Sequence, residues 1–172
     1  MPKGKPAARI TDTVAHPLPP VLTGGPGSRN VLIGKLPAWR GIPATAVPAL
    51  MSAKKTSDIA VKTAETASKA ASGTPAAPGA IAAEQSVKTS AAATMSNAIS
   101  LAAASAAPSI PDIHQCATPL PIPPHGPGVV INGSKTVLIN GLPACRMGDT
   151  IIEALGPPNK ITKGDATVLI GN

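Results

Sequence analysis

The chain has 172 residues, contains no Phe or Tyr and one Trp, and carries a formal net charge of +7. Aromatic side chains supply much of the buried area of ordinary cores and also stack on bases, so a thick globular core and a nucleic-acid-binding surface are both excluded. No apolar stretch of about 18 residues is present, which predicts no membrane insertion. Residues 1–8 are polar, which predicts no secretory signal.

A short pattern occurs three times in the parts of the chain that are rich in Gly and Pro. Residues 27–40 read GSRNVLIGKLPAWR, and residues 133–146 read GSKTVLINGLPACR, in register and without a gap. Residues 164–172 begin a third copy, GDATVLIGN, and residues 5–12 at the other end of the chain supply its missing half. The sequence therefore predicts three repeats, one of them split between the two termini.

Each repeat predicts a β-hairpin. The Val-Leu-Ile run is strongly β-prone, and the Gly-Lys or Asn-Gly pair that follows it permits a two-residue turn with positive φ. The Pro-Ala-x-Arg segment would form the second strand. One hairpin cannot bury its apolar face alone, so we expect the three to close around an axis. The predicted fold is mainly β: a small conical pseudo-threefold β-prism of short hairpins with a thin aliphatic core.

The middle of the chain has a different composition. We expect residues 1–42 and 111–172 to form one discontinuous β-rich unit, and residues 43–110, which are rich in Ala, Ser and Thr, to form an insertion. Because Ala is the strongest helix former, the insertion predicts a helical hairpin over residues 46–72 and 79–107, interrupted at Gly73-Thr74-Pro75-Ala76-Ala77-Pro78-Gly79. A flexible spacer is the alternative, since the apolar stripe of these segments is poor.

The three histidines and one cysteine of the repeat-bearing parts are candidate metal ligands. These residues are His16, His114, Cys116 and His125. Three imidazoles and one thiolate form a closed tetrahedral donor set, which is typical of structural Zn²⁺, while iron is a second candidate because imidazole serves both metals. Loop histidines without a metal are the alternative interpretation.

A second cysteine competes for the thiolate position. Cys145 aligns with Ala8 and Trp39 of the other two repeats, in a position that predicts a packed side chain. A small buried hydrophobe is therefore the better interpretation of Cys145. We accordingly expect Cys116 to be the thiolate ligand.

These repeats resemble the PAAR-repeat family, which is named after its Pro-Ala-Ala-Arg motif. Pro6-Ala7-Ala8-Arg9 matches that motif letter for letter, and residues 37–40 and 143–146 are one-letter variants. The resemblance implies a non-enzymatic cone that caps the trimeric, VgrG-like spike of a contractile injection machine such as a type VI secretion system, an extracellular injection particle or a phage tail. It also implies one copy per spike, a metal near the point, and a broad base that binds the spike.

The same resemblance assigns expectations to the remaining surfaces. The insertion at residues 43–110 would be a docking arm for an effector, an adaptor or the inner wall of a sheath or tube. The protein would reside in the bacterial cytoplasm during assembly and then be secreted or delivered into the target cell. Aliphatic residues of the three Val-Leu-Ile runs are candidates for contact with the spike: Val31, Ile33, Val137, Ile139, Val168 and Ile170.

The recurring charged residues carry two interpretations. Arg9, Arg40 and Arg146 occupy the same repeat position, where they would either bond to neighbouring loops or the spike, or lie in solvent. Asp12 and Asp149 are also equivalent to each other and are candidates for pairing with these arginines or for capping turns.

Two rival functions stay open at this point. A small zinc-dependent hydrolase would hold an ion through His16, His114 and His125 and leave one position open to water. Alternatively, a PAAR cone would carry its own toxin in residues 43–110, although the scarcity of acidic residues and the absence of His and Cys in that segment argue against it.

Overall fold

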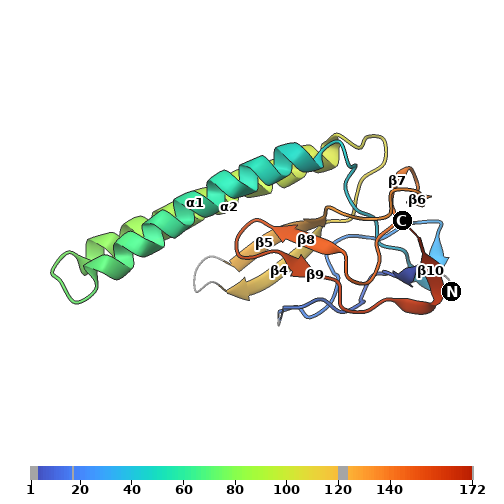
Figure 1. The fold of residues 1–172 in the computed structure, drawn as a ribbon, viewed down its shortest axis with the longest axis horizontal. Helices are drawn as coiled ribbons and strands as arrows, with labels where there is room; N and C mark the ends of the chain where they lie inside the picture. Colours follow the sequence, from blue (N-terminus) through green and yellow to red (C-terminus); the bar gives the residue numbers. More distant parts are fainter. Residues whose placement is uncertain (1–3, 17, 120–123, 172) are drawn as a thin grey trace.

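The fold was analysed in a computed structural model, which describes residues 4–16, 18–119 and 124–171. Within these ranges the chain forms short strands at both ends and two long helices between them (Figure 1). The strands are β1 (Lys5–Ala7), β2 (Leu32–Ile33), β3 (Leu36–Pro37), β4 (His114–Pro119), β5 (Pro124–Val130), β6 (Leu138–Ile139), β7 (Leu142–Pro143), β8 (Thr150–Glu153), β9 (Asn159–Lys160) and β10 (Asp165–Ile170). The helices are α1 (Val47–Ala71) and α2 (Ala77–Ala104).

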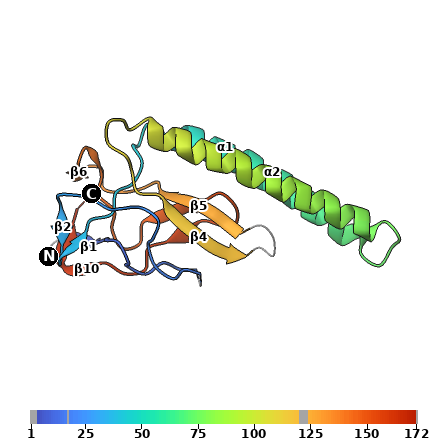
Figure 2. The same cartoon turned by 180° about the vertical axis from the view of Figure 1, so that it is seen from behind.

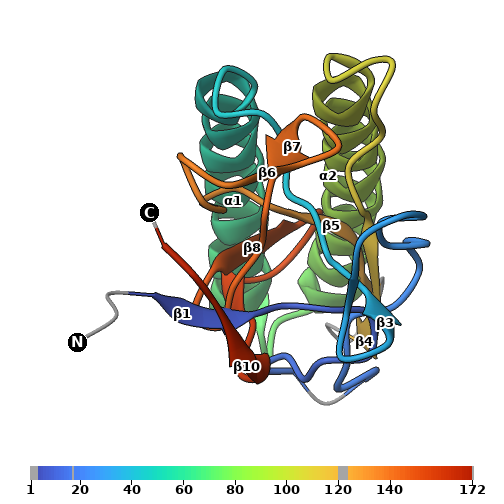
Figure 3. The same ribbon diagram turned by 90° about the vertical axis from the view of Figure 1, so that its right-hand side faces the viewer.

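The three repeats form three antiparallel hairpins in the same register. β2 pairs with β3 and β6 with β7, each time with the Leu of the Val-Leu-Ile run opposite the Pro of the next strand. β1 pairs with β10 in that register too, with Leu169 opposite Pro6. The two ends of the chain therefore complete one repeat, as the sequence predicts. Figure 3 shows the three hairpins arranged around the end of the molecule that carries both termini.

A closed ring of backbone hydrogen bonds joins the three repeats. Ala8 N donates to Cys145 O at 2.9 Å, Cys145 N donates to Trp39 O at 3.0 Å, and Trp39 N donates to Ala8 O at 2.9 Å. Each repeat thus donates to one neighbour and accepts from the other, which is the pattern of a threefold axis. This ring confirms the predicted pseudo-threefold arrangement.

The thin core is organised in layers around this axis. One cluster contains three alanines and three isoleucines, one of each from every repeat: Ala7, Ala38, Ala144, Ile33, Ile139 and Ile170. The next cluster contains Trp39, which is 0% exposed, and the side chains that occupy its position in the other repeats. Alanine is needed on the axis because three segments of the chain, one from each repeat, approach one another closely there.

Each repeat arginine is held by an aspartate in the same geometry. In the first and third instances the aspartate follows three residues later: Arg9 pairs with Asp12 and Arg146 with Asp149, with N–O distances of 3.0 and 3.1 Å. Arg40 makes the same contact at 3.0 Å with Asp112, which lies on the far side of the insertion. These contacts favour the interpretation in which the arginines bond to neighbouring loops.

The helical insertion enters the chain inside one of these Arg-to-Asp turns. Asp112 N donates to Arg40 O at 3.1 Å, just as Asp12 N donates to Arg9 O at 3.1 Å in the uninterrupted repeat. The chain therefore leaves and re-enters the β-rich part at neighbouring points. Consequently the helices extend from one repeat without opening the ring.

The two helices form the expected antiparallel hairpin and lie along the sheet β4-β5-β8-β9 (Figures 1 and 2). Leu50, Met95 and Ile99 are at most 2% exposed and pack on Val129 of β5. α2 begins at Ala77, slightly before the expected position, because Pro78 is tolerated in a first helical turn. The turn at residues 72–76 lies beyond the ends of β4 and β5. Neither helix is apolar enough over a sufficient length to cross a membrane.

We predict that enlarging one axial alanine destabilises the protein. Ala144→Leu should cost about 1–3 kcal/mol in the free energy of unfolding, because Ala144 is 0% exposed and has no room to expand. The same change at the exposed Ala166 of β10 should cost no more than about 0.5 kcal/mol. Urea unfolding of both variants tests this, and equal costs would contradict the close packing of the axis.

Candidate metal centre

Two of the predicted ligands lie on one face of strand β4. His114 and Cys116 are buried, while Gln115 between them is exposed. Side chains alternate between the faces of a strand, so residues two apart point the same way. The His-x-Cys spacing is therefore explained by an extended strand and directs an imidazole and a thiol into the same space.

A glycine on strand β5 leaves space for an acidic side chain of strand β8 next to His114. Gly128 of β5 pairs with His114 on one side and with Glu153 of β8 on the other. A Cβ atom at Gly128 would lie 2.8 Å from Glu153 Cγ, which is closer than packed carbon atoms approach. The absence of a side chain at position 128 thus leaves room for Glu153 beside His114.

The donor atoms of His16, His114, Cys116 and Glu153 all lie within 4.8 Å of one another, and all four residues are buried. His16 Nε2 is 2.7 Å from His114 Nε2 and 3.3 Å from Glu153 Oε1. Metal–donor bonds of 2.0–2.3 Å in a tetrahedron place donors about 3.3–3.8 Å apart, so shifts of about 1 Å would centre these atoms on one ion. The cluster therefore fits a metal ion, whose identity the donors leave open between zinc and iron.

His16 reaches this cluster from the loop that follows residues 5–12, the N-terminal half of the split repeat. Its Nδ1 atom is buried and has no hydrogen-bond partner among the described residues. A buried polar nitrogen without a partner is costly in a folded chain. The ring is therefore held with Nε2 toward the cluster at the expense of its other nitrogen, which favours a role for Nε2 as a ligand.

The fourth predicted ligand, His125, lies next to Glu153. Its Nδ1 is 2.6 Å from Glu153 Oε2, so the carboxylate lies between this ring and the other donors. Direct ligation by His125 stays a prediction, and the contact equally suits a histidine that orients the carboxylate. Sequence reasoning missed Glu153. The available signal was an acidic residue in the otherwise apolar run Ile151–Leu155, where a buried charge needs a partner.

Burial keeps the two closest imidazoles neutral. Desolvation, reinforced by the neighbouring His16, lowers the pKa of His114 to about 4. Desolvation also lowers the pKa of His16, against the opposing influence of Glu153. Burial raises the pKa of the Cys116 thiol, so this side chain stays protonated until a cation displaces its proton. The imidazoles are thus in the form that binds metal ions.

Cys145 lies in the axial core, away from this cluster. It is 0% exposed, and burial raises its pKa well above the ordinary value. Its backbone belongs to the ring around the axis, and its side chain packs with Ala8 and Trp39. This placement agrees with the interpretation of Cys145 as a small buried hydrophobe.

The predicted spike-contact residues divide into two groups. Ile33, Ile139 and Ile170 are only 6–7% exposed because they point into the axial cluster. Val31 is half-buried, whereas Val137 and Val168 are 37% and 38% exposed. Direct contact through the isoleucines would require them to leave this packing. The leucine between each Val and Ile is the most exposed residue of its run, and the sequence analysis did not select it: Leu32, Leu138 and Leu169.

We predict that acid destabilises the metal-free protein. The unfolded chain protonates His114 near pH 6.5 and the folded chain near pH 4, so between these values the unfolded state binds more protons. The free energy of unfolding should therefore fall as the pH falls through this window, by up to about 3 kcal/mol for His114. Urea unfolding of chelator-treated protein at several pH values measures it. His114→Gln should flatten the dependence, and an unchanged slope would contradict the assignment.

Comparison with known families bears on the identity of this chain. The family model described as PAAR motif matches residues 121–172, which contain the second full repeat, the C-terminal half-repeat and Glu153. No curated protein and no solved structure matches the chain. The matched segment contains the hairpin β6–β7 and strand β10, the C-terminal half of the split repeat. The match confirms the predicted resemblance to PAAR-repeat proteins over residues 121–172, which carry a PAAR motif.

Proposed function

We propose that this protein is the non-enzymatic tip of the trimeric spike of a contractile injection machine, with its three hairpins toward the spike and its metal centre stabilising the body above them. The observation that carries the proposal is the closed threefold ring of repeats. A single chain with threefold symmetry offers three equivalent surfaces to a trimer, so one copy would suffice for each spike.

The three exposed leucines are the best candidates for the contact with the spike. Leu32, Leu138 and Leu169 are 60%, 57% and 43% exposed, and the common register of the hairpins places them at equivalent positions around the axis. Three equivalent aliphatic side chains suit a threefold apolar partner surface. In this arrangement the buried isoleucines would support the leucines, with Val137 and Val168 beside them.

A metal ion would add rigidity where the core is thin. The cluster joins the loop of His16, strand β4 and the end of β8, which are far apart in the sequence. With four protein donors the coordination shell would be closed, which suits a structural ion and leaves no position for a reacting water. Binding free energy at such a site contributes directly to folding. This donor set supports the non-enzymatic role over the hydrolase alternative.

The helical hairpin would be the accessory or cargo contact. It projects along and beyond the sheet that carries the metal ligands, while the hairpins at the other end stay free (Figure 1). Spike binding and cargo binding would therefore use separate surfaces. We propose that the protein is assembled in the bacterial cytoplasm and leaves the cell on the injection apparatus.

We predict that the purified protein contains about one equivalent of zinc, held by the cluster. His114→Ala and Cys116→Ala should lose the ion, because each removes a donor atom. Cys145→Ala should keep it, since the equivalent residue of the split repeat is already Ala8. Elemental analysis measures the occupancy, and zinc retained in Cys116→Ala but lost in Cys145→Ala would refute the site.

A related comparison separates Glu153 from His125. Loss of a residue that only orients a ligand weakens metal binding by about 10–100-fold, whereas loss of a ligand costs more. In competition with a chelator, whichever of Glu153→Gln and His125→Ala removes a ligand should lower the metal affinity more than the other variant does.

Removing the ion should lower the unfolding temperature. Metal-dependent hydrolysis of ester or peptide substrates would instead favour the enzyme alternative.

We predict that the leucines determine binding to a folded VgrG-like spike trimer. Each of the substitutions Leu32→Asp, Leu138→Asp and Leu169→Asp should lower the affinity about tenfold, because it removes a buried aliphatic contact. The triple variant should therefore form no detectable complex. Ile81→Asp is the matched control, because this isoleucine is 48% exposed near the start of α2, at the end of the helical insertion away from the β-hairpins (Figure 1). Sedimentation of the mixed proteins measures the complex. A wild-type chain that fails to bind, or a triple variant that still binds, would contradict the proposal.

A further inference from the structure

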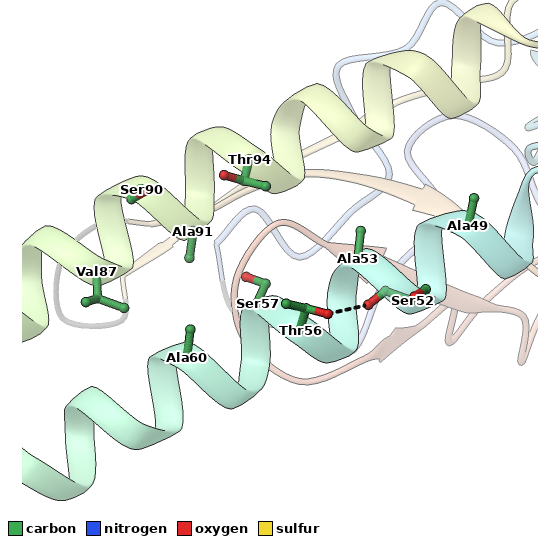
Figure 4. A pocket seen from close by; sticks show the side chains of 10 residues that line it. All are labelled: Ala49, Ser52, Ala53, Thr56, Ser57, Ala60, Val87, Ser90, Ala91 and Thr94. Atoms are coloured by element: carbon green, nitrogen blue, oxygen red, sulfur yellow. Dashed lines mark hydrogen bonds between the residues drawn. The ribbon is translucent and has the colours of Figure 1, made fainter.

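The outer face of the helical hairpin contains a long groove between α1 and α2. The groove has a volume of about 790 Å³ and is lined by small side chains from both helices, with Val87 the largest (Figure 4). A second hollow of about 290 Å³ shares Ala49 with it and extends it toward Thr45 and Leu101. From Thr45 to Ala60 the helical rise gives a length of about 23 Å, or roughly four turns of a docked helix.

Charged side chains avoid this face completely. The six charged residues of α1 and the two of α2 include none that lines the groove. At 100° per residue the six on α1 fall within an arc of about 100°, which contains Lys54. Lys54 Nζ donates to Gly156 O at 2.8 Å, so this arc faces the β-rich part. The groove therefore lies on the opposite, uncharged half of the hairpin.

One buried hydroxyl in the groove has no partner. Ser57 is 7% exposed, and its Oγ makes no hydrogen bond with any described residue. Neighbouring hydroxyls in these helices bond to the carbonyl four residues earlier, as Thr56 does to Ser52 (Figure 4). Ser57 instead lines the groove, where its hydroxyl faces the gap toward α2. An unpaired buried hydroxyl is costly, so a bound group that pairs with it would gain affinity.

We propose that this groove binds one α-helix of a partner protein, with an uncharged face of small and aliphatic residues and a polar side chain opposite Ser57. A charge on that face would be desolvated without a counter-charge, because the groove has none. Small residues along both walls permit the close helix approach that such packing needs. The inference rests on the proposed function, in which the partner is the effector or adaptor.

A single partner helix fits the groove better than a second copy of this chain does. Helices pack by inserting a ridge of one surface into the groove of another. A second copy would present the same concave surface, so two grooves would face each other and leave the space between them unfilled. One helix supplies the missing ridge and would complete a three-helix bundle with α1 and α2.

The test titrates the full chain with labelled helical peptides of about 18 residues, a length that spans the groove. The panel carries Ala, Ser, Thr and Leu on one face, and each peptide has a copy with two lysines on that face. We expect the uncharged peptides to bind and the charged copies to bind at least tenfold more weakly. Fluorescence anisotropy measures the affinity. If no uncharged peptide binds, or if the charged copies bind equally well, the inference is overturned.

Variants of the chain locate the site. Ala60→Glu places a charge in the groove and should abolish peptide binding, whereas Ala93→Glu, exposed on α2 outside the groove lining, should leave binding unchanged. Ser57→Ala should raise the unfolding temperature of the free chain but weaken peptide binding about fivefold. A neutral effect of Ser57→Ala on both measurements would refute the role of this hydroxyl.

Two further measurements identify the occupant and separate this inference from spike binding. A concentration-dependent dimer in sedimentation, abolished by Ala60→Glu, would identify a second copy as the occupant and overturn the proposal. Ala60→Glu should leave binding to a VgrG-like spike trimer unchanged, because the hairpins lie elsewhere. If the wild-type chain does not bind the spike, the proposed function is refuted. If it binds the spike but none of the peptides, only the inference about the groove is refuted.

Discussion

The ring of backbone hydrogen bonds through Ala8, Trp39 and Cys145 is the constraint on which the rest of the structure depends. Each bond joins two repeats that are separated in sequence, and the ring closes only because β1 and β10 bring the two ends of the chain together. Around this axis three segments of the chain, one from each repeat, approach so closely that a layer of alanines fills the centre. The absence of Phe and Tyr suits this geometry, since the narrow core holds one large ring, that of the buried Trp39.

The metal centre uses the same framework at a different level of the molecule. The sheet β4-β5-β8-β9 places His114, Gly128 and Glu153 side by side, and the glycine leaves the space in which the donors meet. His16 contributes from the N-terminal loop, so the cluster depends on the termini being correctly joined. Cross-linking by an ion would compensate for the small apolar area that a narrow prism can bury. The two features therefore stabilise the body in complementary ways.

The repeats and the residue composition predicted the main elements of this structure. The hairpins, the split copy, the two helices and the packed position of Cys145 all follow from alignment of the repeats and from residue propensities. Asp112 was missed because the insertion separates it from Arg40, so the repeat spacing no longer reveals the pair. Glu153 was missed because its strand is otherwise apolar, and the exposed leucines were missed because only the register shows which side of a two-residue strand faces outward.

The position of the insertion has a consequence for how such proteins can diversify. Arg40 O and Asp112 N are 3.1 Å apart, and the guanidinium of Arg40 grips the carboxylate of Asp112 across the same gap. The two points where the insertion leaves and re-enters the β-rich part are thus held at a fixed separation, whatever segment lies between them. Any segment whose own ends meet at that distance could replace the helices and leave the ring of three repeats closed, which makes this joint a point where insertions can be exchanged.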